Sequence, residues 1–214
     1  MATAMEPQAR ANDRQWFIVS RWQEYEGEGR ANLLRIIGVT VFYAVQLYYY
    51  HLQLNDQARA DYRPFHLAIT MLTLAWMMVG LGVLLCRKNY FFPGSLKFIS
   101  TACDLVLLTA MIGLANGPKS PLVVIYFLII TLACLRFHLP LIWFATGGAL
   151  AGYVFLAGHA YWFAEAKRVT PNQHLIIVLA LVLTGVILGQ VIRRVRSLAI
   201  NYSQRLGQQN GNKP

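Results

Sequence analysis

The sequence predicts an all-α polytopic membrane protein, built as a bundle of six transmembrane helices with an interfacial amphipathic helix before the first. Six long apolar stretches follow one another, the connections between them are short, and 57% of the residues are hydrophobic. A helix that crosses a hydrocarbon core of about 30 Å needs roughly 17–25 mostly apolar residues. Apolarity here is continuous instead of alternating, which excludes a transmembrane barrel. Helices that satisfy their own backbone in lipid are therefore expected.

The six expected spans divide the chain into one membrane domain and two flanking segments. The spans are expected at residues 33–50, 65–86, 98–115, 122–137, 141–163 and 175–192, and the fourth is the shortest. The membrane domain therefore covers residues 33–192, between segments 1–32 and 193–214. No connection is long enough to hold a further domain.

The segment before the first span has the pattern of a surface helix. Trp16, Val19, Trp22 and Tyr25 recur every three residues among charged side chains within residues 13–30. This spacing places the apolar residues on one helix face, which suits a helix lying in the cytoplasmic headgroup layer. An irregular segment with scattered aromatic residues is the alternative.

The last span is expected to continue outward as a basic helical extension that ends in a polar tail, over residues 193–214. Val195, Leu198 and Tyr202 have a three-to-four spacing that could begin a coiled coil in a homodimer. A basic stop at the membrane surface explains the same residues without a partner.

Basic residues predict the orientation, because Lys and Arg near span ends are retained on the cytoplasmic side. With both termini cytoplasmic in a bacterial inner membrane, that side holds 14 of the 19 basic residues. The net charge of +10 is then explained by anionic inner-leaflet lipid, and nucleic acid is not an expected partner. The five outer basic residues are Arg59, Arg63, Lys119, Lys167 and Arg168.

Two glycine pairs indicate close helix packing. Gly148 and Gly152 in the fifth span, and Gly185 and Gly189 in the sixth, have the four-residue spacing that lets helix backbones approach. Packing within one chain is the expected use, and a dimer interface is the alternative.

One acidic residue lies inside a span, where a charge is costly. If the third and fourth spans form a hairpin that turns near Pro118, Asp104 lies beside Ala133 and Thr101 lies beside Arg136. We therefore expect an intramembrane ion pair between Asp104 and Arg136. A proton-binding or ligand-binding carboxylate, and simple contact with water, are the alternatives.

Signatures of catalysis are missing from the sequence, so we expect no enzyme. There is no His-Glu-x-x-His pair, no phosphate-binding glycine loop with lysine and no Gly-x-Ser-x-Gly. His51, His66, His159 and His174 lie at the outer ends of spans, but no two are spaced as ligands on one helix face. No catalytic or metal site is expected.

One segment resembles a known family. The turn Asn116-Gly-Pro-Lys-Ser-Pro121, followed by an apolar helix with Tyr126, is similar to a stretch in the six-helix membrane regions of bacterial sensor histidine kinases. In redox-sensing members this turn is associated with quinone binding. The resemblance implies a site for a quinone-like lipid-phase ligand at Asn116, Gly117, Ser120, Pro121 and Tyr126. Asn116 replaces the first glycine of the family turn, and the phosphoacceptor and ATP-binding regions of a kinase do not occur in the 214 residues.

Together these features predict a non-enzymatic membrane sensor that passes a lipid-phase or outer-face cue to a separate cytoplasmic signalling protein. The alternative is a structural or assembly subunit of a larger membrane complex. A small transporter is a third hypothesis, although the spans contain few polar residues that could line a path.

Overall fold

The computed structural model describes residues 5–89 and 94–211, and every regular element in these ranges is a helix. The all-α prediction is thus confirmed. The six α-helices are α1 (Met5–Tyr48), α2 (Asp56–Lys88), α3 (Leu96–Leu114), α4 (Ile125–Cys134), α5 (Leu139–Phe163) and α6 (Pro171–Gly211). A π-helical turn, Tyr49–Gln53, ends α1, and short 3₁₀ turns at Gly117–Lys119, Pro121–Val124 and Glu165–Lys167 lie in the later connections.

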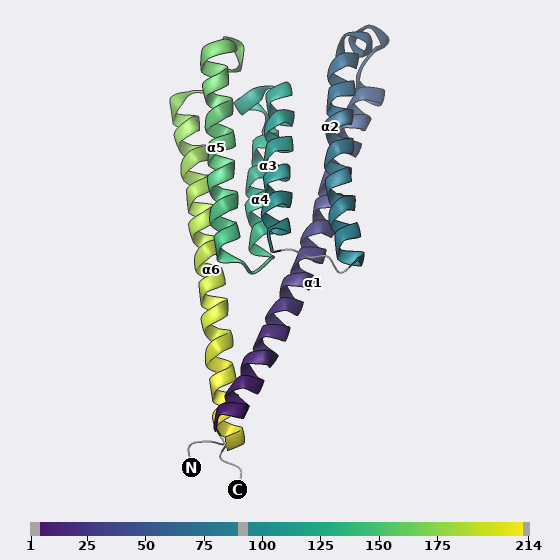
Figure 1. Ribbon diagram of the computed structural model, residues 1–214. Coiled ribbons are helices and arrows are strands. Elements are labelled where there is room, and N and C mark those ends of the chain that lie inside the picture. Colours follow the sequence, from purple (N-terminus) through teal and green to yellow (C-terminus); the bar gives the residue numbers. More distant parts are fainter. Residues whose placement is uncertain (1–4, 90–93, 212–214) are drawn as a thin grey trace.

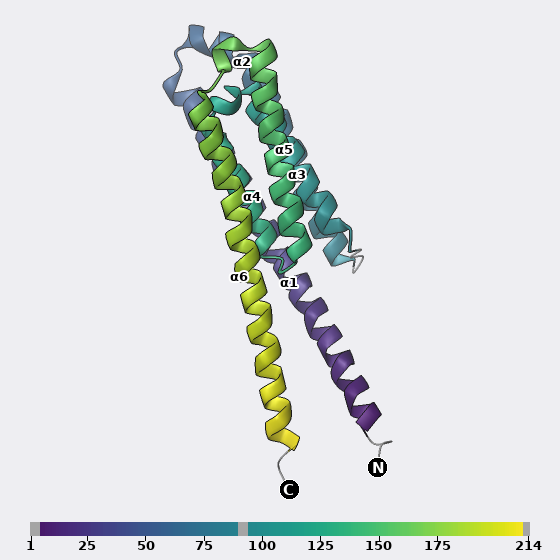
Figure 2. The same cartoon turned by 90° about the vertical axis from the view of Figure 1, so that its left-hand side faces the viewer.

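The helices run alternately in opposite directions, and α1 begins on the same side as that on which α6 ends (Figure 1). We call this the terminal side, and the opposite one, where α1 turns into α2, the hairpin side. Both α1 and α6 project well beyond the other helices on the terminal side, and the two projections separate clearly in the rotated view (Figure 2). Helices α3 to α6 form one bundle, and α1 with α2 forms a hairpin beside it.

Five helical segments of the described residues are long and apolar enough to cross a membrane, so a membrane protein is confirmed at that level. They are Glu26–Gln53, Asp56–Cys86, Leu96–Leu114, Leu139–Phe163 and Pro171–Val195. The fourth apolar helix, Pro121–Cys134, is shorter, and at 1.5 Å per residue it reaches only about 20 Å. Six crossings and two cytoplasmic termini therefore remain predictions.

The fourth helix is short for a local reason at each end. Pro121 starts it as a 3₁₀ turn, and the predicted span 122–137 stops at Cys134, three residues early. Phe137 then has a φ of 50°, in the left-handed region, and His138 is extended before α5 begins. The chain thus reverses direction within a few residues.

The predicted interfacial helix is not a separate element. Residues 13–30 lie within α1, which runs unbroken from Met5 into the first apolar segment. The structure does not describe the side chains of residues 5–25, so the predicted apolar face of Trp16, Val19, Trp22 and Tyr25 lies outside the described residues. Likewise, α6 continues unbroken to Gly211, so residues 193–211 extend the last helix.

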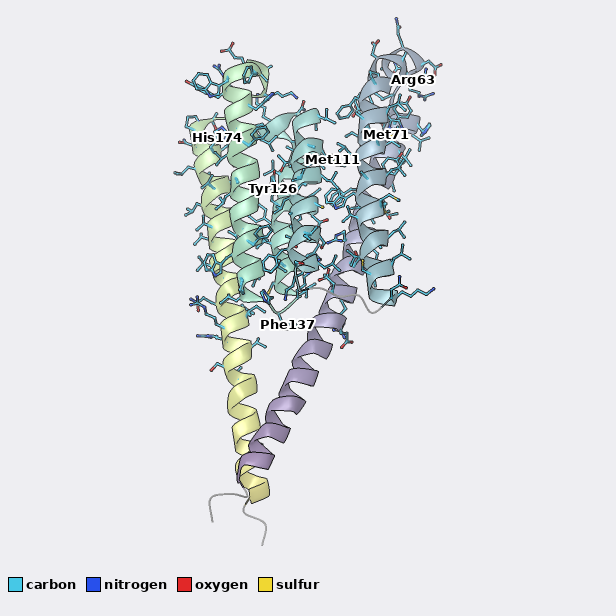
Figure 3. The ribbon with its side chains drawn as sticks, in the orientation of Figure 1. Arg63, Met71, Met111, Tyr126, Phe137 and His174 are labelled. Atoms are coloured by element: carbon cyan, nitrogen blue, oxygen red, sulfur yellow. The ribbon has the colours of Figure 1, made fainter. Side chains whose placement is uncertain are left out.

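Most of the core lies among α3, α4, α5 and α6, where Tyr126 is fully buried (Figure 3), and it extends to Val39 of α1 and to Ile69 and Trp76 of α2. Gly148 and Gly152 face α3, since a Cβ at either would meet Leu105 or Thr109 at 2.5–2.6 Å. A Cβ at Gly185 would clash with Thr146 of α5, and one at Gly189 would meet Leu139 at 3.6 Å. Both glycine pairs therefore pack within the chain.

Candidate functional site: a buried ionic network below an apolar crevice

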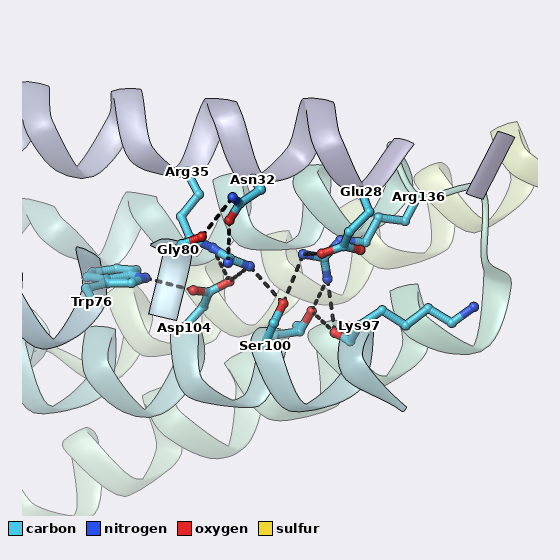
Figure 4. A network of polar contacts seen from close by, with 10 residues as sticks. Glu28, Asn32, Arg35, Trp76, Gly80, Lys97, Ser100, Asp104 and Arg136 are labelled. Carbon is cyan, nitrogen blue, oxygen red and sulfur yellow. Dashed lines mark hydrogen bonds and ion pairs between the residues drawn. The ribbon is translucent and has the colours of Figure 1, made fainter. Parts of the chain in front are cut away.

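A network of buried polar side chains joins α1 to the bundle at the terminal end of α3 (Figure 4). Arg35 of α1 is its centre. Its Nη2 lies 2.8 Å from Asp104 Oδ2, and its Nε donates to the same oxygen at 3.1 Å. Trp76 Nε1 of α2 donates to Asp104 Oδ1 at 2.7 Å. The carboxylate therefore has a donor on each oxygen, as a buried charge requires.

The remaining guanidinium atoms of Arg35 are also occupied. Nη1 donates to Asn32 Oδ1 at 3.0 Å and Nη2 to Ser100 Oγ at 2.9 Å, while the Asn32 amide donates to the Gly80 carbonyl at 3.0 Å. Arg35 is thus tied directly to α1 and α3, and Asn32 connects this pair of helices to α2.

Arg136, just after α4, forms the second half of the network. Its Nη1 donates to Thr101 Oγ1 at 2.6 Å and to the Lys97 carbonyl at 3.0 Å, and its Nη2 donates to Ser100 Oγ at 3.1 Å. Ser100 therefore lies between the two guanidinium groups and accepts from both. An arginine stays protonated at neutral pH, so the buried Arg136 guanidinium requires an anion nearby.

That anion is Glu28 of α1, whose Oε1 lies 2.8 Å from Arg136 Nη2. The contact lacks the angle of a hydrogen bond, and Arg136 Nε has no acceptor among the described residues. Both side chains are buried. The Glu28–Arg136 half is therefore less completely satisfied than the Arg35–Asp104 half, and it is the easier of the two to release.

The predicted direct pair between Asp104 and Arg136 is corrected by these contacts. The hairpin register behind the prediction is right, because Thr101 does contact Arg136. Each charge nevertheless has its ion-pair partner on α1: Arg35 for Asp104 and Glu28 for Arg136.

A sequence signal for these partners exists. Glu28, Asn32 and Arg35 are spaced by four and three residues, so they share one face of a continuous helix. The prediction missed them because it started the first span at residue 33 and treated Glu28 as part of a surface helix.

Two glycines let α1 approach closely enough for the network to form. A Cβ at Gly27 would lie 2.8 Å from the Leu135 carbonyl oxygen, and one at Gly80 would lie 3.1 Å from Ile36. Gly27 thus brings α1 against the end of α4, and Gly80 brings it against α2. Larger side chains would keep the guanidinium groups from their partners.

On the hairpin side of the network, α1 and α4 diverge and leave an apolar crevice of about 80 Å³. Arg35, Trp76, Thr73 and Asp104 form its polar end. The walls come from α1, α2, α3 and α4, and Tyr43 and Gln46 lie toward the hairpin side. The apolar wall residues include Leu34, Gly38, Val39, Phe42, Ile69, Met111, Leu122, Ile125, Leu128, Ile129 and Leu132.

The predicted ligand-binding turn has different surroundings. Ser120 is buried and its Oγ accepts from the Leu122 amide at 3.3 Å, whereas the Tyr126 hydroxyl lies 2.7 Å from Thr109 Oγ1 inside the bundle. Asn116 and Pro121 are exposed. The Ser120 and Tyr126 hydroxyls therefore already have protein partners, in separate places.

The connection between α5 and α6 covers this turn. Lys167 Nζ donates to the carbonyls of Gly113 and Ala115 at 3.1 and 2.6 Å, and Lys119 Nζ donates to the Ala166 carbonyl at 2.8 Å. Gly117, with a φ of 58°, packs under the Lys167 side chain. Lys167 therefore caps the end of α3, where helix carbonyls lack partners of their own.

Replacing Lys167 with Met should lower the free energy of unfolding by about 1.5 kcal/mol, because two carbonyls lose a charged donor. The check is SDS-induced unfolding in mixed micelles. Lys119→Met removes one exposed bond and serves as the control; an equal loss in both variants would contradict this role of Lys167.

Two of the four outer histidines, His51 and His66, lie close together, with ring centroids 6.4 Å apart, while His159 and His174 lie elsewhere. His66 stacks on Tyr50 with ring centroids 3.9 Å apart, His174 Nδ1 lies 2.8 Å from the Tyr153 hydroxyl, and His159 packs against Phe163. Among the described residues, no group of three or more His, Cys, Asp or Glu side chains could hold a metal ion.

Comparison with protein-family models, with curated proteins and with solved structures finds no match for this chain. The resemblance to the membrane regions of sensor kinases therefore stays a prediction from one turn and from the helix layout.

Proposed function

We propose that the protein is a membrane signalling module in which the tilt of α1 carries a cue from the crevice to the terminal side. The observation behind the proposal is the position of the ionic network, which holds α1 near its middle while the crevice opens on one side and a long free helix extends on the other.

The lengths make α1 a lever. From the network at Gly27–Arg35, α1 extends about 35 Å toward Met5 and about 20 Å toward Tyr48, at 1.5 Å per residue. A displacement of about 2 Å at Tyr48 would then move Met5 by about 3–4 Å in the opposite direction. The terminal side is where a cytoplasmic partner would detect the change.

Hydrogen bonds between α1 and α2 would make the hairpin-side half of these two helices move together. The Tyr43 hydroxyl lies 3.0 Å from Thr70 Oγ1, and Gln46 donates to the Tyr62 hydroxyl at 3.3 Å. Arg59 donates to the carbonyls of Tyr50, His51 and Leu54 and so closes the turn. These contacts keep α1 on α2, so separation from α4 would tilt the pair together.

The network suits a two-state pivot. The Arg35–Asp104 half is fully hydrogen-bonded and would hold the fulcrum, while the less satisfied Glu28–Arg136 half would separate when α1 tilts. A switch requires two arrangements that differ by only a few kcal/mol. The imperfect pair supplies that small difference.

The experiment measures the distance between the two projecting helices. Spin labels at Asn12→Cys and Ser203→Cys, with the three native cysteines replaced, report it in bilayers by pulsed electron paramagnetic resonance. Filling the crevice with Gly38→Leu should shift the distance distribution by several ångström. Glu28→Gln, which weakens the Glu28–Arg136 ion pair, should broaden the distance distribution.

Gly82→Leu is the matched control, because a Cβ there has no neighbour within 4 Å and Gly82 lies outside the crevice. This control should leave the distance unchanged. Unchanged distance distributions in both Gly38→Leu and Glu28→Gln would refute the lever. That result would favour an assembly subunit, in which α1 is a static docking helix.

A further inference from the structure

The crevice opens to the lipid phase. Leu34, Phe42 and Leu128 line it and are 46%, 44% and 42% exposed, so its mouth lies between α1 and α4 within the apolar part of both helices. Its volume of about 80 Å³ is several times the roughly 10–15 Å³ that one water needs. Water is nevertheless a poor occupant, because the walls are apolar and the polar end is already hydrogen-bonded.

The polar end excludes a charged occupant. Arg35 and Asp104 neutralise each other at 2.8 Å, and Asn32, Ser100 and Trp76 take their other hydrogen bonds. A buried ion from a ligand would find no counter-charge there and would lose its own hydration. Whatever enters the deep part of the crevice is therefore uncharged.

Only the hairpin-side end offers polar groups to a ligand. Tyr43 and Gln46 line this end. The Tyr43 hydroxyl is bonded to Thr70 and one amide N–H of Gln46 to Tyr62, so the second amide N–H of Gln46 can bind a neutral ester carbonyl. Below them Val39, Ile69 and Ile129 line the walls, and their side chains offer only apolar surface to an occupant. A polar group at the hairpin-side rim, followed by apolar walls down to the neutral Arg35–Asp104 pair, matches a lipid whose ester lies above its chain.

We propose that the crevice binds one acyl chain of a bilayer phospholipid, which enters between α1 and α4 past Gly38 and reaches Trp76. Gly38 makes this passage, because a Cβ there would still be 4.0 Å from Leu128. The inference rests on the proposed function in one respect: the chain is the occupant that would set the tilt of α1. Binding itself needs no movement.

Fluorescence of Trp76 tests the proposal, because this side chain lines the crevice and is only 5% exposed. The other four tryptophans are replaced by Phe, and the protein is placed in phosphatidylcholine bilayers with or without bromine at mid-chain. The bromine atoms should quench most of the Trp76 emission. Unchanged emission would overturn the proposal, since a brominated chain in the crevice would lie against this ring.

A blocked crevice provides the control. Gly38→Leu should restore most of the Trp76 emission, with Gly38→Val as a second variant, whereas Gly82→Leu should leave the quenching intact. Quenching that persists with Gly38 blocked would place the chain elsewhere and overturn the site. A variant that keeps only Trp143, which is 45% exposed, shows the full effect of bulk lipid.

Headgroup charge separates chain binding from headgroup binding. Brominated phosphatidylglycerol should quench as much as brominated phosphatidylcholine, and a strong preference for the anionic lipid would refute the neutral site. If Gly38→Leu removes quenching but leaves the α1–α6 distance unchanged, the acyl site stands and the signalling proposal fails. If quenching persists in Gly38→Leu but the α1–α6 distance shifts, the acyl-chain proposal fails and the signalling proposal stands.

Discussion

Replacing Arg35 with Gln should lower the free energy of unfolding by about 3–5 kcal/mol, because it leaves the Asp104 carboxylate buried without its ion-pair partner. Asp104→Asn should cost less than this, since the amide oxygen can still accept from Trp76. The double variant should lose less unfolding free energy than the sum of the two single losses. The difference should be about 2–3 kcal/mol, which is the coupling expected of contacting residues.

Unfolding in SDS mixed micelles measures each corner of this cycle. The same cycle with Asp104→Asn and Arg136→Gln should show the smaller coupling, because the ion-pair partner of Arg136 is Glu28. Arg30→Gln is the control: Arg30 pairs with Glu26 at 2.8 Å but is 71% exposed, so its loss should cost under about 1 kcal/mol. Stronger coupling of Asp104 to Arg136 than to Arg35 would contradict the network.

Substituting Ala for Gly27 should destabilise the protein by about 1–3 kcal/mol, through overpacking against a backbone that cannot yield. Its Cβ would lie 2.8 Å from the Leu135 carbonyl oxygen. The substitution should also pull Glu28 away from Arg136, because both contacts lie at the same crossing of α1 over the end of α4.

Gly82→Ala is the control for the effect of alanine on helix stability. With no neighbour within 4 Å, it should stabilise α2 by about 0.5–1 kcal/mol. The unfolding measurement compares the two variants, and the spin-label distance reports whether α1 has moved. If both substitutions stabilise equally, α1 does not approach α4 as described.

The sequence by itself determined the features that depend on local pattern. Continuous apolar stretches predicted helices and a membrane protein, because helix formation in lipid needs only the residues of one segment. The α3–α4 hairpin has the predicted register, shown by Thr101 beside Arg136, since a short turn constrains which residues face each other. Glycine spacing likewise predicted packing within the chain.

Only the tertiary structure decided which distant segments meet. Asp104 pairs with Arg35, 69 residues away, and Lys167 covers a turn about 50 residues before it. Burial makes every charge require a partner, but any helix of the bundle can supply one. The partner depends on where Gly27 and Gly80 allow α1 to cross its neighbours, and the crevice is the space left where α1 then departs from α4.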